Sequence, residues 1–131
     1  MIEEIAYENI KIGHSEKKLE ILAGDEVMHL LEETTFLAEW ESLYQTCHWA
    51  TVFQSPDFVT TWYRLYHHAY LPILIREHTI DGLSGLLTLA LPLQKQNSRT
   101  FIVGAGHHEA DYHTWLASDN NGDSFISSAL K

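Results

Sequence analysis

Basic residues are scarce in this sequence. Eight lysines and arginines stand against eighteen aspartates and glutamates, so the 131-residue chain carries a formal net charge of −10 at pH 7. A surface with this charge repels the phosphates of nucleic acids and the headgroups of anionic lipids. We therefore expect neither nucleic acid nor a membrane as a partner.

Cysteine is almost absent. The single Cys47 excludes an internal disulfide and is compatible with a reducing compartment. Its neighbours Thr46 and His48 provide no cationic cluster that would activate a thiolate. We interpret Cys47 as packing on a helix face, and a catalytic nucleophile stays the alternative.

Long apolar runs are also missing. The longest, residues 83–93, is interrupted by Ser84, Thr88 and Pro92 and is too short to span a bilayer. The first residues, MIEEIAYENIK, begin acidic and lack the apolar region of a signal peptide. The expected location is the cytoplasm.

The apolar content is nevertheless sufficient for one core. Hydrophobic residues make up 45% of the chain, which fits a single domain over residues 1–131. Residues 1–18 are polar and charged, and we expect a weak strand or an extended arm there. The elements described below predict an α/β (α+β) fold, with a mixed, largely antiparallel sheet and at least one helix on each side.

The strongest local pattern predicts a capped helix over residues 56–68. Ser55 offers an oxygen to the free N–H groups of the first turn, and Pro56 stands where a missing N–H costs nothing. We interpret the aromatic face of this helix as core, with ligand stacking as the alternative. That face consists of Phe58, Trp62, Leu65 and Ala69, widened by Val59, Tyr63 and Tyr66.

Two apolar patterns precede this helix. Residues 19–23 form a short apolar run that predicts a strand, which ends at Gly24. Between residues 27 and 47 apolar side chains recur at helical spacing. Thr34 and Thr35 interrupt the pattern, so the segment forms one helix or two, with the second starting near Phe36.

A long antiparallel hairpin is predicted to follow the helix. Residues 73–75 are consecutive and apolar, and Asp81 with Gly82 marks the turn. Gly85 lies inside the second strand, which indicates a bulge or a close approach of backbone. The expected faces of that strand are Leu83, Leu87, Leu89, Leu91 and Leu93 on one side, and Ser84, Leu86, Thr88, Ala90 and Pro92 on the other.

The remaining elements are expected to be short. Strands are predicted over residues 100–103 and 112–117, and a helix over 125–131 capped by Asp123 or Ser124. Because so short a helix does not stand alone, we expect the chain to be part of a longer protein. The apolar stripe of this helix either contacts a second copy in a homodimer or packs on its own sheet. It consists of Phe125, Ile126, Ala129 and Leu130.

Two segments contain residues of the types that bind metal ions or phosphates. Residues 107–113, HHEADYH, contain metal-ligand types, but adjacent histidines in an extended segment point in opposite directions, so we expect no metal site. Gly104 and Gly106 are typical of a phosphate-binding loop. The third glycine is missing, however, and we expect no helix directly after Gly106.

Three motifs occur in a fixed order. They are Phe53, Gln54, Ser55, Pro56 and Trp62; then Asp81, Gly82, Leu83, Gly85, Leu86 and Leu87; then Gly104, Gly106, Asp111 and Tyr112. This order resembles the F-Q-S-P helix, the D-G-x-x-x-G-L-L hairpin and the G-x-G to D-Y segment of GNAT-type acyltransferases of the CelD-like, FemAB-related group. The resemblance covers about residues 19–116 and concerns the N-terminal half of those proteins, with Gly85 one residue early.

The resemblance implies a GNAT-like sheet flanked by helices, in one half of a two-domain N-acyltransferase. In that family the acyl-CoA or acyl-tRNA site lies chiefly in the second half, at a Q/R-x-x-G-x-G/A motif. Here Phe101 stands three residues before Gly104, and Arg99 is out of register. We therefore expect no cofactor in this chain and acyl-CoA in a second half.

The implied role is to form one wall of a cleft for a small-molecule acceptor, an amine of an amino sugar or similar polysaccharide precursor. The candidate substrate-binding residues are Gln54, His107, Asp111 and Tyr112, and no catalytic residue is assigned. The alternative is a stand-alone, non-catalytic module that binds a ligand or partner in the same cleft. A second half with the cofactor motif after Lys131 would distinguish the two.

Overall fold

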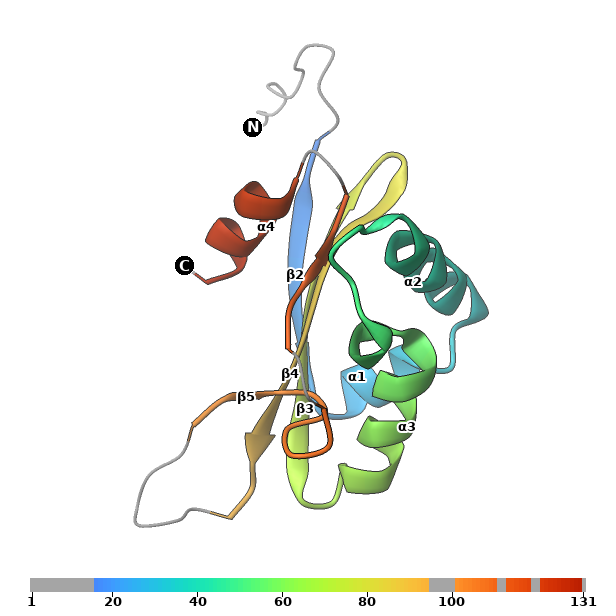
Figure 1. Cartoon of the computed structure of the whole chain (residues 1–131). Helices are drawn as coiled ribbons and strands as arrows, with labels where there is room; N and C mark the ends of the chain where they lie inside the picture. Colours follow the sequence, from blue (N-terminus) through green and yellow to red (C-terminus); the bar gives the residue numbers. More distant parts are fainter. Residues whose placement is uncertain (1–15, 95–100, 111–112, 119–120, 131) are drawn as a thin grey trace, which may run out of the picture.

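The computed structural model of this chain describes residues 16–94, 101–110, 113–118 and 121–130, and it shows a twisted sheet between two helical layers (Figure 1). The strand order is β2-β3-β4-β5, and β6 also pairs with β4. Every described pairing is antiparallel, which confirms the predicted fold class. The strands are β2 (Lys18–Ala23), β3 (Tyr70–Thr79), β4 (Gly82–Pro92), β5 (Val103–Gly104) and β6 (Leu116–Ala117).

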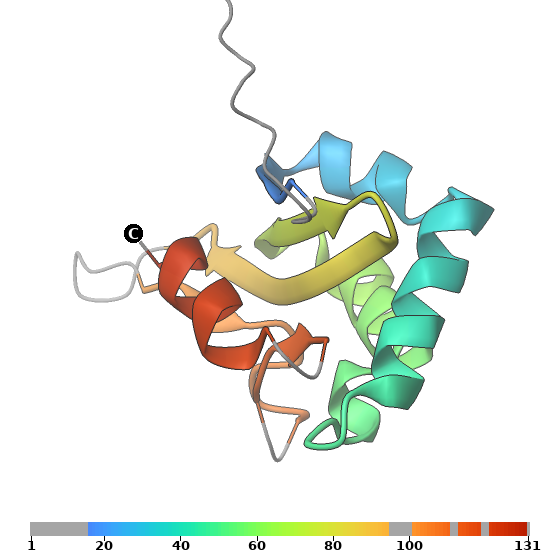
Figure 2. The same cartoon turned by 90° about the horizontal axis from the view of Figure 1, so that it is seen from above.

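One face of the sheet carries most of the helices. Figure 2 shows α1, α2 and α3 on one side of β4, and α4 on the other. The predicted helical segment between residues 27 and 47 forms two helices, and the second begins at Thr34 rather than near Phe36. The helices are α1 (Asp25–Leu30), α2 (Thr34–Thr46), the 3-10 turn η2 (Val52–Gln54), α3 (Pro56–Tyr66) and α4 (Gly122–Ala129).

Helix α3 begins at Pro56 as predicted and ends at Tyr66, before the expected end at residue 68. The Ser55 hydroxyl accepts from the backbone N–H of Phe58 at 3.2 Å, which confirms the predicted cap. The predicted apolar face was wrong at Leu65, which is 62% exposed. The buried arc of α3 is centred on Val59, and Leu65 lies about 120° around the helix from it.

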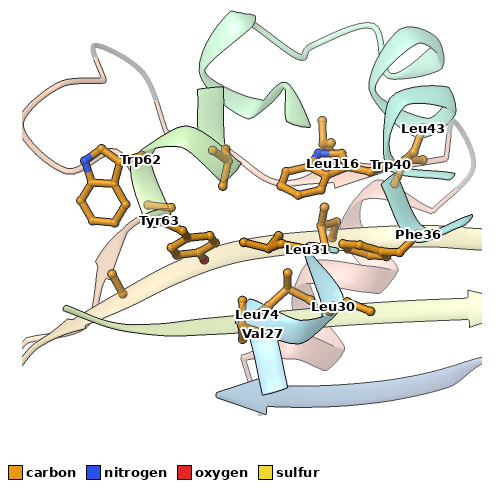
Figure 3. Close-up of a cluster of buried hydrophobic side chains, with 14 of the residues drawn as sticks. Val27, Leu30, Leu31, Phe36, Trp40, Leu43, Trp62, Tyr63, Leu74 and Leu116 are labelled. Carbon is orange, nitrogen blue, oxygen red and sulfur yellow. The ribbon is translucent and has the colours of Figure 1, made fainter. Parts of the chain in front are cut away.

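The main core fills the space between the sheet and α1, α2 and α3. Figure 3 shows Trp62 at one end of this cluster and Phe36, Trp40 and Leu43 at the other. Cys47 is buried there, in agreement with the packing interpretation. The buried members are Val27, Leu30, Leu31, Phe36, Trp40, Leu43, Cys47, Val59, Trp62, Tyr63, Leu74, Leu86, Ala90, Ala105 and Leu116.

A bulge lies near the turn of the hairpin. His78 pairs with Leu83 and Glu77 pairs with Gly85, so Ser84 is an extra residue on β4. The bulge reverses the alternation at that point, and Leu83 packs against the main core instead of sharing the opposite face with Leu87. The predicted leucine face was therefore wrong at Leu83, whereas the predicted bulge is confirmed.

Helix α4 covers part of the other face of the sheet. Phe125 and Ala129 are buried and pack with Ile75, Leu87 and Ala117, so these members of the predicted stripe fold back onto their own sheet. A Cβ on Gly85 would lie 2.4 Å from the Phe125 ring, so the group that approaches Gly85 closely is a side chain and not the expected backbone.

The termini of α4 differ from the expected ones. The helix begins at Gly122 rather than 125, with Asn121 at the N-cap position, and Leu130 is exposed. Strands β5 and β6 are shorter than predicted, and residues 100 and 112 lie outside the described part of the chain. No helix in the described segments is long and apolar enough to cross a membrane.

Candidate functional site

An open cleft of about 610 Å³ runs along the outer side of α3. Its walls are aromatic and aliphatic, and three carboxylate side chains line it. None of its described lining residues is basic. We call it the α3 cleft, and its lining residues are Glu41, Tyr44, Val52, Ser55, Asp57, Phe58, Thr61, Trp62, Leu65, Tyr66 and Glu109.

Two aromatic donors hold one of these carboxylates. The indole N–H of Trp62 donates to Oε1 of Glu109 at 2.9 Å. The hydroxyl of Tyr66 donates to Oε2 at 3.1 Å. Trp62 is only 3% exposed, whereas Glu109 is exposed, so a core residue fixes an acid that solvent and ligands can reach.

The turn that carries Glu109 is shaped by Gly106. This glycine has φ +99°, a conformation that side-chain-bearing residues rarely adopt. A Cβ there would lie 2.9 Å from both the Phe58 ring and the Cβ of Ala110. The turn after β5 therefore rests directly on α3, and this contact brings Glu109 to the cleft.

The hydrogen bonds set the charge states of the pair. The N–H of Trp62 lowers the pKa of Glu109 below its ordinary value, against the smaller opposing effect of burial. The hydrogen bond to Glu109 raises the pKa of Tyr66. At neutral pH the site therefore contains a carboxylate and a neutral phenol.

Further aromatic rings continue from the cleft to the histidines. Tyr70 lies 5.1 Å from Trp62 and 6.0 Å from His107 between ring centroids. The His107 and His108 rings are 3.9 Å apart. Their segment forms a turn, so the expectation that the two rings point in opposite directions was wrong. Partial burial, with His108 and His113 nearby, lowers the pKa of His107, so this imidazole is neutral at pH 7.

The predicted substrate-binding residues occupy different environments. Gln54 is buried, and its side-chain oxygen accepts from the N–H and hydroxyl of Thr51 at 2.8 and 3.0 Å. It belongs to the capping structure before α3 and lines a separate, largely apolar cavity of about 300 Å³. His107 lies beside Tyr70 near the α3 cleft, and Asp111 and Tyr112 lie outside the described residues.

Sequence reasoning placed Glu109 in the segment with metal-ligand types and Tyr66 on the aromatic helix face, but it did not predict that Glu109 bonds to Tyr66 and Trp62. A buried tryptophan usually needs a partner for its N–H, so Trp62 could have directed attention to an acid distant in sequence. The segment HHEADYH offers both Glu109 and Asp111, however, and only the turn at Gly106 brings Glu109 to the indole.

The two glycines of the suspected phosphate loop are in contact with the protein itself. A Cβ at Gly104 would lie 2.5 Å from the His113 ring. Residues 105–109 form turns, which confirms that no helix follows Gly106 directly. Within the described segments, no group of three histidine, cysteine or acidic side chains is placed to hold a metal ion.

Comparisons with protein-family models, curated proteins and solved structures give no match. The functional assignment therefore rests on the chemistry of the α3 cleft and on the order of the three sequence motifs.

Proposed function

We propose that this chain forms the acceptor-binding wall of an N-acyltransferase, with the α3 cleft as the binding site for the acceptor amine. The observation that carries the proposal is the cleft itself, which is open, of small-molecule size and lined by aromatic rings and carboxylates. It lies along the helix that begins at Ser55 and Pro56, in the motif on which the resemblance depends.

The acyl donor belongs elsewhere in this proposal. A Cβ at Gly104 or Gly106 would meet the side chains of His113, Phe58 or Ala110, so both glycines have a packing role and need no phosphate to explain them. We propose that a second GNAT-like half binds acyl-CoA and that the assembled enzyme works in the cytoplasm. The acceptor proposed from the resemblance is an amino sugar or a related polysaccharide precursor.

A stand-alone binding module is the second candidate. The residues that line the α3 cleft all come from α2, α3, the turn before α3 and the turn after β5 of this chain. This chain alone therefore supplies a concave surface that a small ligand could bind. The enzyme predicts binding of a small molecule and acyl transfer by the natural gene product. The module predicts binding of a small ligand or of a partner, without acyl transfer.

Ligand binding is tested by titrating the isotopically labelled chain with glucosamine, N-acetylglucosamine and glucose while backbone and indole N–H signals are followed by NMR. We expect at least one of these sugars to shift the signals of Trp62 and Tyr66. Absence of shifts in the α3 cleft with all three would overturn the acceptor-binding proposal. Acetyl transfer from acetyl-CoA, assayed with the natural gene product, then separates the enzyme from the module.

A further inference from the structure

We infer that the α3 cleft selects molecules that carry a primary ammonium group, and that the Glu109 carboxylate is the anchor for that group. The inference rests on the proposed function, because it names the charge state in which the acceptor amine binds. It concerns recognition of the amine, not its acylation.

The hydrogen bonds of Glu109 leave it able to bind a donor. Each carboxylate oxygen has two lone-pair sites, and each accepts one side-chain hydrogen bond, from Trp62 at 2.9 Å or from Tyr66 at 3.1 Å. The backbone N–H of Glu109 also interacts with its carboxylate, so of the four sites at least one stays open to a ligand. The two bonds also fix the orientation of the carboxylate, so less conformational entropy is lost when a ligand N–H binds.

The surrounding charge favours a cation. Asp57 and Glu41 line the same cleft as Glu109, and no lysine, arginine or histidine is among its described lining residues, although His108, just outside the lining, acts on Glu109 through its charge. Three carboxylates along one concave surface create a negative potential that concentrates cations and repels phosphates and carboxylates. The net charge of −10 acts in the same direction over longer distances.

The remaining lining fits the carbon skeleton of such a molecule. The rings of Tyr44, Phe58 and Tyr66 are half-buried in the cleft wall, and Val52 and Leu65 are exposed beside them. Aromatic faces attract ammonium groups and pack against the apolar face of a sugar ring. A carboxylate with open lone pairs requires N–H donors, so a primary ammonium fits better than a quaternary one.

The experiment compares two sugars that differ in charge at one nitrogen. Glucosamine and N-acetylglucosamine are titrated into the chain by NMR at about pH 6, where an ordinary amine is protonated. We expect glucosamine to bind at least about tenfold more tightly, because only its nitrogen is charged. Added salt should weaken the binding of glucosamine and leave that of N-acetylglucosamine nearly unchanged.

Two substitutions separate the anchor from a general charge effect. Glu109→Gln keeps the shape of the side chain and an acceptor for Trp62 but removes the charge. It should weaken glucosamine binding by about fivefold or more. Asp123→Asn removes one negative charge from α4 on the opposite face of the sheet and should leave the affinity within about twofold.

The outcomes distinguish failure of the ammonium inference from failure of the acceptor-binding proposal. Equal affinity for both sugars, or an unchanged glucosamine affinity in a folded Glu109→Gln protein, overturns the ammonium inference and leaves the acceptor-binding function standing. No binding of either sugar overturns both. If Glu109→Gln lowers the unfolding midpoint, its glucosamine affinity is measured well below that midpoint and compared with that of Asp57→Asn, which removes a lining charge with no described side-chain partner. Asp57→Asn should weaken glucosamine binding less than Glu109→Gln does, and equal weakening by the two variants overturns the anchor role of Glu109.

Discussion

The indole N–H of Trp62 donates a 2.9 Å hydrogen bond to Glu109, which lies 47 residues further along the chain. This bond joins the middle of α3 to the turn after β5. Trp62 also belongs to the main core (Figure 3). The same side chain therefore packs the interior and orients an exposed acid. Substitutions that keep its packing but remove its N–H can therefore separate the two roles.

Replacement of Trp62 by phenylalanine should raise the pKa of Glu109 toward its ordinary value. The N–H of Trp62 is the largest cause of the lowered pKa, and phenylalanine cannot donate. Carboxyl carbon chemical shifts followed against pH measure the change. Trp115→Phe is the matched control, because the indole N–H of Trp115 has no described partner. An unchanged pKa of Glu109 in Trp62→Phe would contradict the conclusion that the Trp62 N–H lowers it.

The same pKa predicts how stability depends on acid. Because folding lowers the pKa of Glu109, its contribution is fully present above the unfolded value of about 4.5 and is lost as the pH falls through the lower folded value. The free energy of unfolding, measured with urea, should therefore fall more between about pH 5 and pH 3 in the natural protein than in Glu109→Gln. Parallel pH profiles for the two proteins would show that Glu109 adds no such dependence.

Removal of the Tyr63 hydroxyl should destabilise the fold. This hydroxyl lies 2.8 Å from the carbonyl oxygen of Leu89 and 3.1 Å from that of Ile73, so it connects α3 to both β3 and β4. Burial raises the pKa of Tyr63 far above its usual range. Tyr63→Phe should lower the free energy of unfolding by about 1–3 kcal/mol, since it removes the hydrogen bond of a hydroxyl on a fully buried side chain.

Tyr66→Phe is the control for that measurement. The Tyr66 ring is only half-buried and its hydroxyl bonds to an exposed carboxylate, so the loss should be clearly smaller than that of Tyr63→Phe. Urea denaturation of both variants gives the comparison. Equal losses would mean that the buried hydroxyl of Tyr63 has no special role.

The elements that sequence predicted best are those with local causes. The start of α3 follows from Ser55 and Pro56, and the bulge near Gly85 follows from a glycine within a strand. The bond between Glu109 and Trp62 was missed because it joins segments distant in sequence. Short strands such as β5 and β6 are held by β4 rather than by their own pattern, which explains the error in their lengths.

The start of α4 was misjudged for a similar reason. Capping rules favoured Asp123 or Ser124, but Asn121 occupies the N-cap position and its side chain makes no cap. Its amide instead donates to Oε1 of Glu77 at 2.5 Å and to the carbonyl of Ser84 at 3.2 Å. A tertiary contact at the bulge thus positions the helix, and no local pattern encodes that contact.

Alanine at position 121 should loosen α4 from the sheet. Asn121→Ala leaves the buried Glu77 carboxylate with one donor fewer, which should cost about 1–3 kcal/mol. Hydrogen exchange should then accelerate in α4 more than in α3. Ser127→Ala on the exposed side of α4 is the control and should change stability by less than about 0.5 kcal/mol. Similar exchange in both variants would contradict this role of Asn121.

A methyl group at Gly85 should also displace α4. The Cβ of Gly85→Ala would lie 2.4 to 2.8 Å from atoms of the Phe125 ring, so the helix must shift at a cost of about 1–3 kcal/mol. Phe125→Leu removes the ring edge, and by itself it also lowers the free energy of unfolding. The double variant should be more stable than the sum of the two losses predicts, because the added methyl then has room. If the stability losses of the two single variants simply add in the double variant, the Phe125 ring is not what the added methyl group meets.

The isolated chain should not bind acetyl-CoA. The cofactor cradle of the resembled family needs free backbone N–H groups at a glycine-rich turn that opens a helix. Here the space beside Gly104 is filled by His113, and the space beside Gly106 by Phe58 and Ala110. The backbone N–H of His107 is already bonded to the carbonyl of Gly104 at 3.0 Å. Calorimetry with acetyl-CoA should therefore give no heat of binding, in a sample whose glucosamine binding shows that the chain is folded. Micromolar affinity for acetyl-CoA would place a cofactor site in this chain. It would refute the proposal that this chain binds the acceptor and a second half binds acyl-CoA.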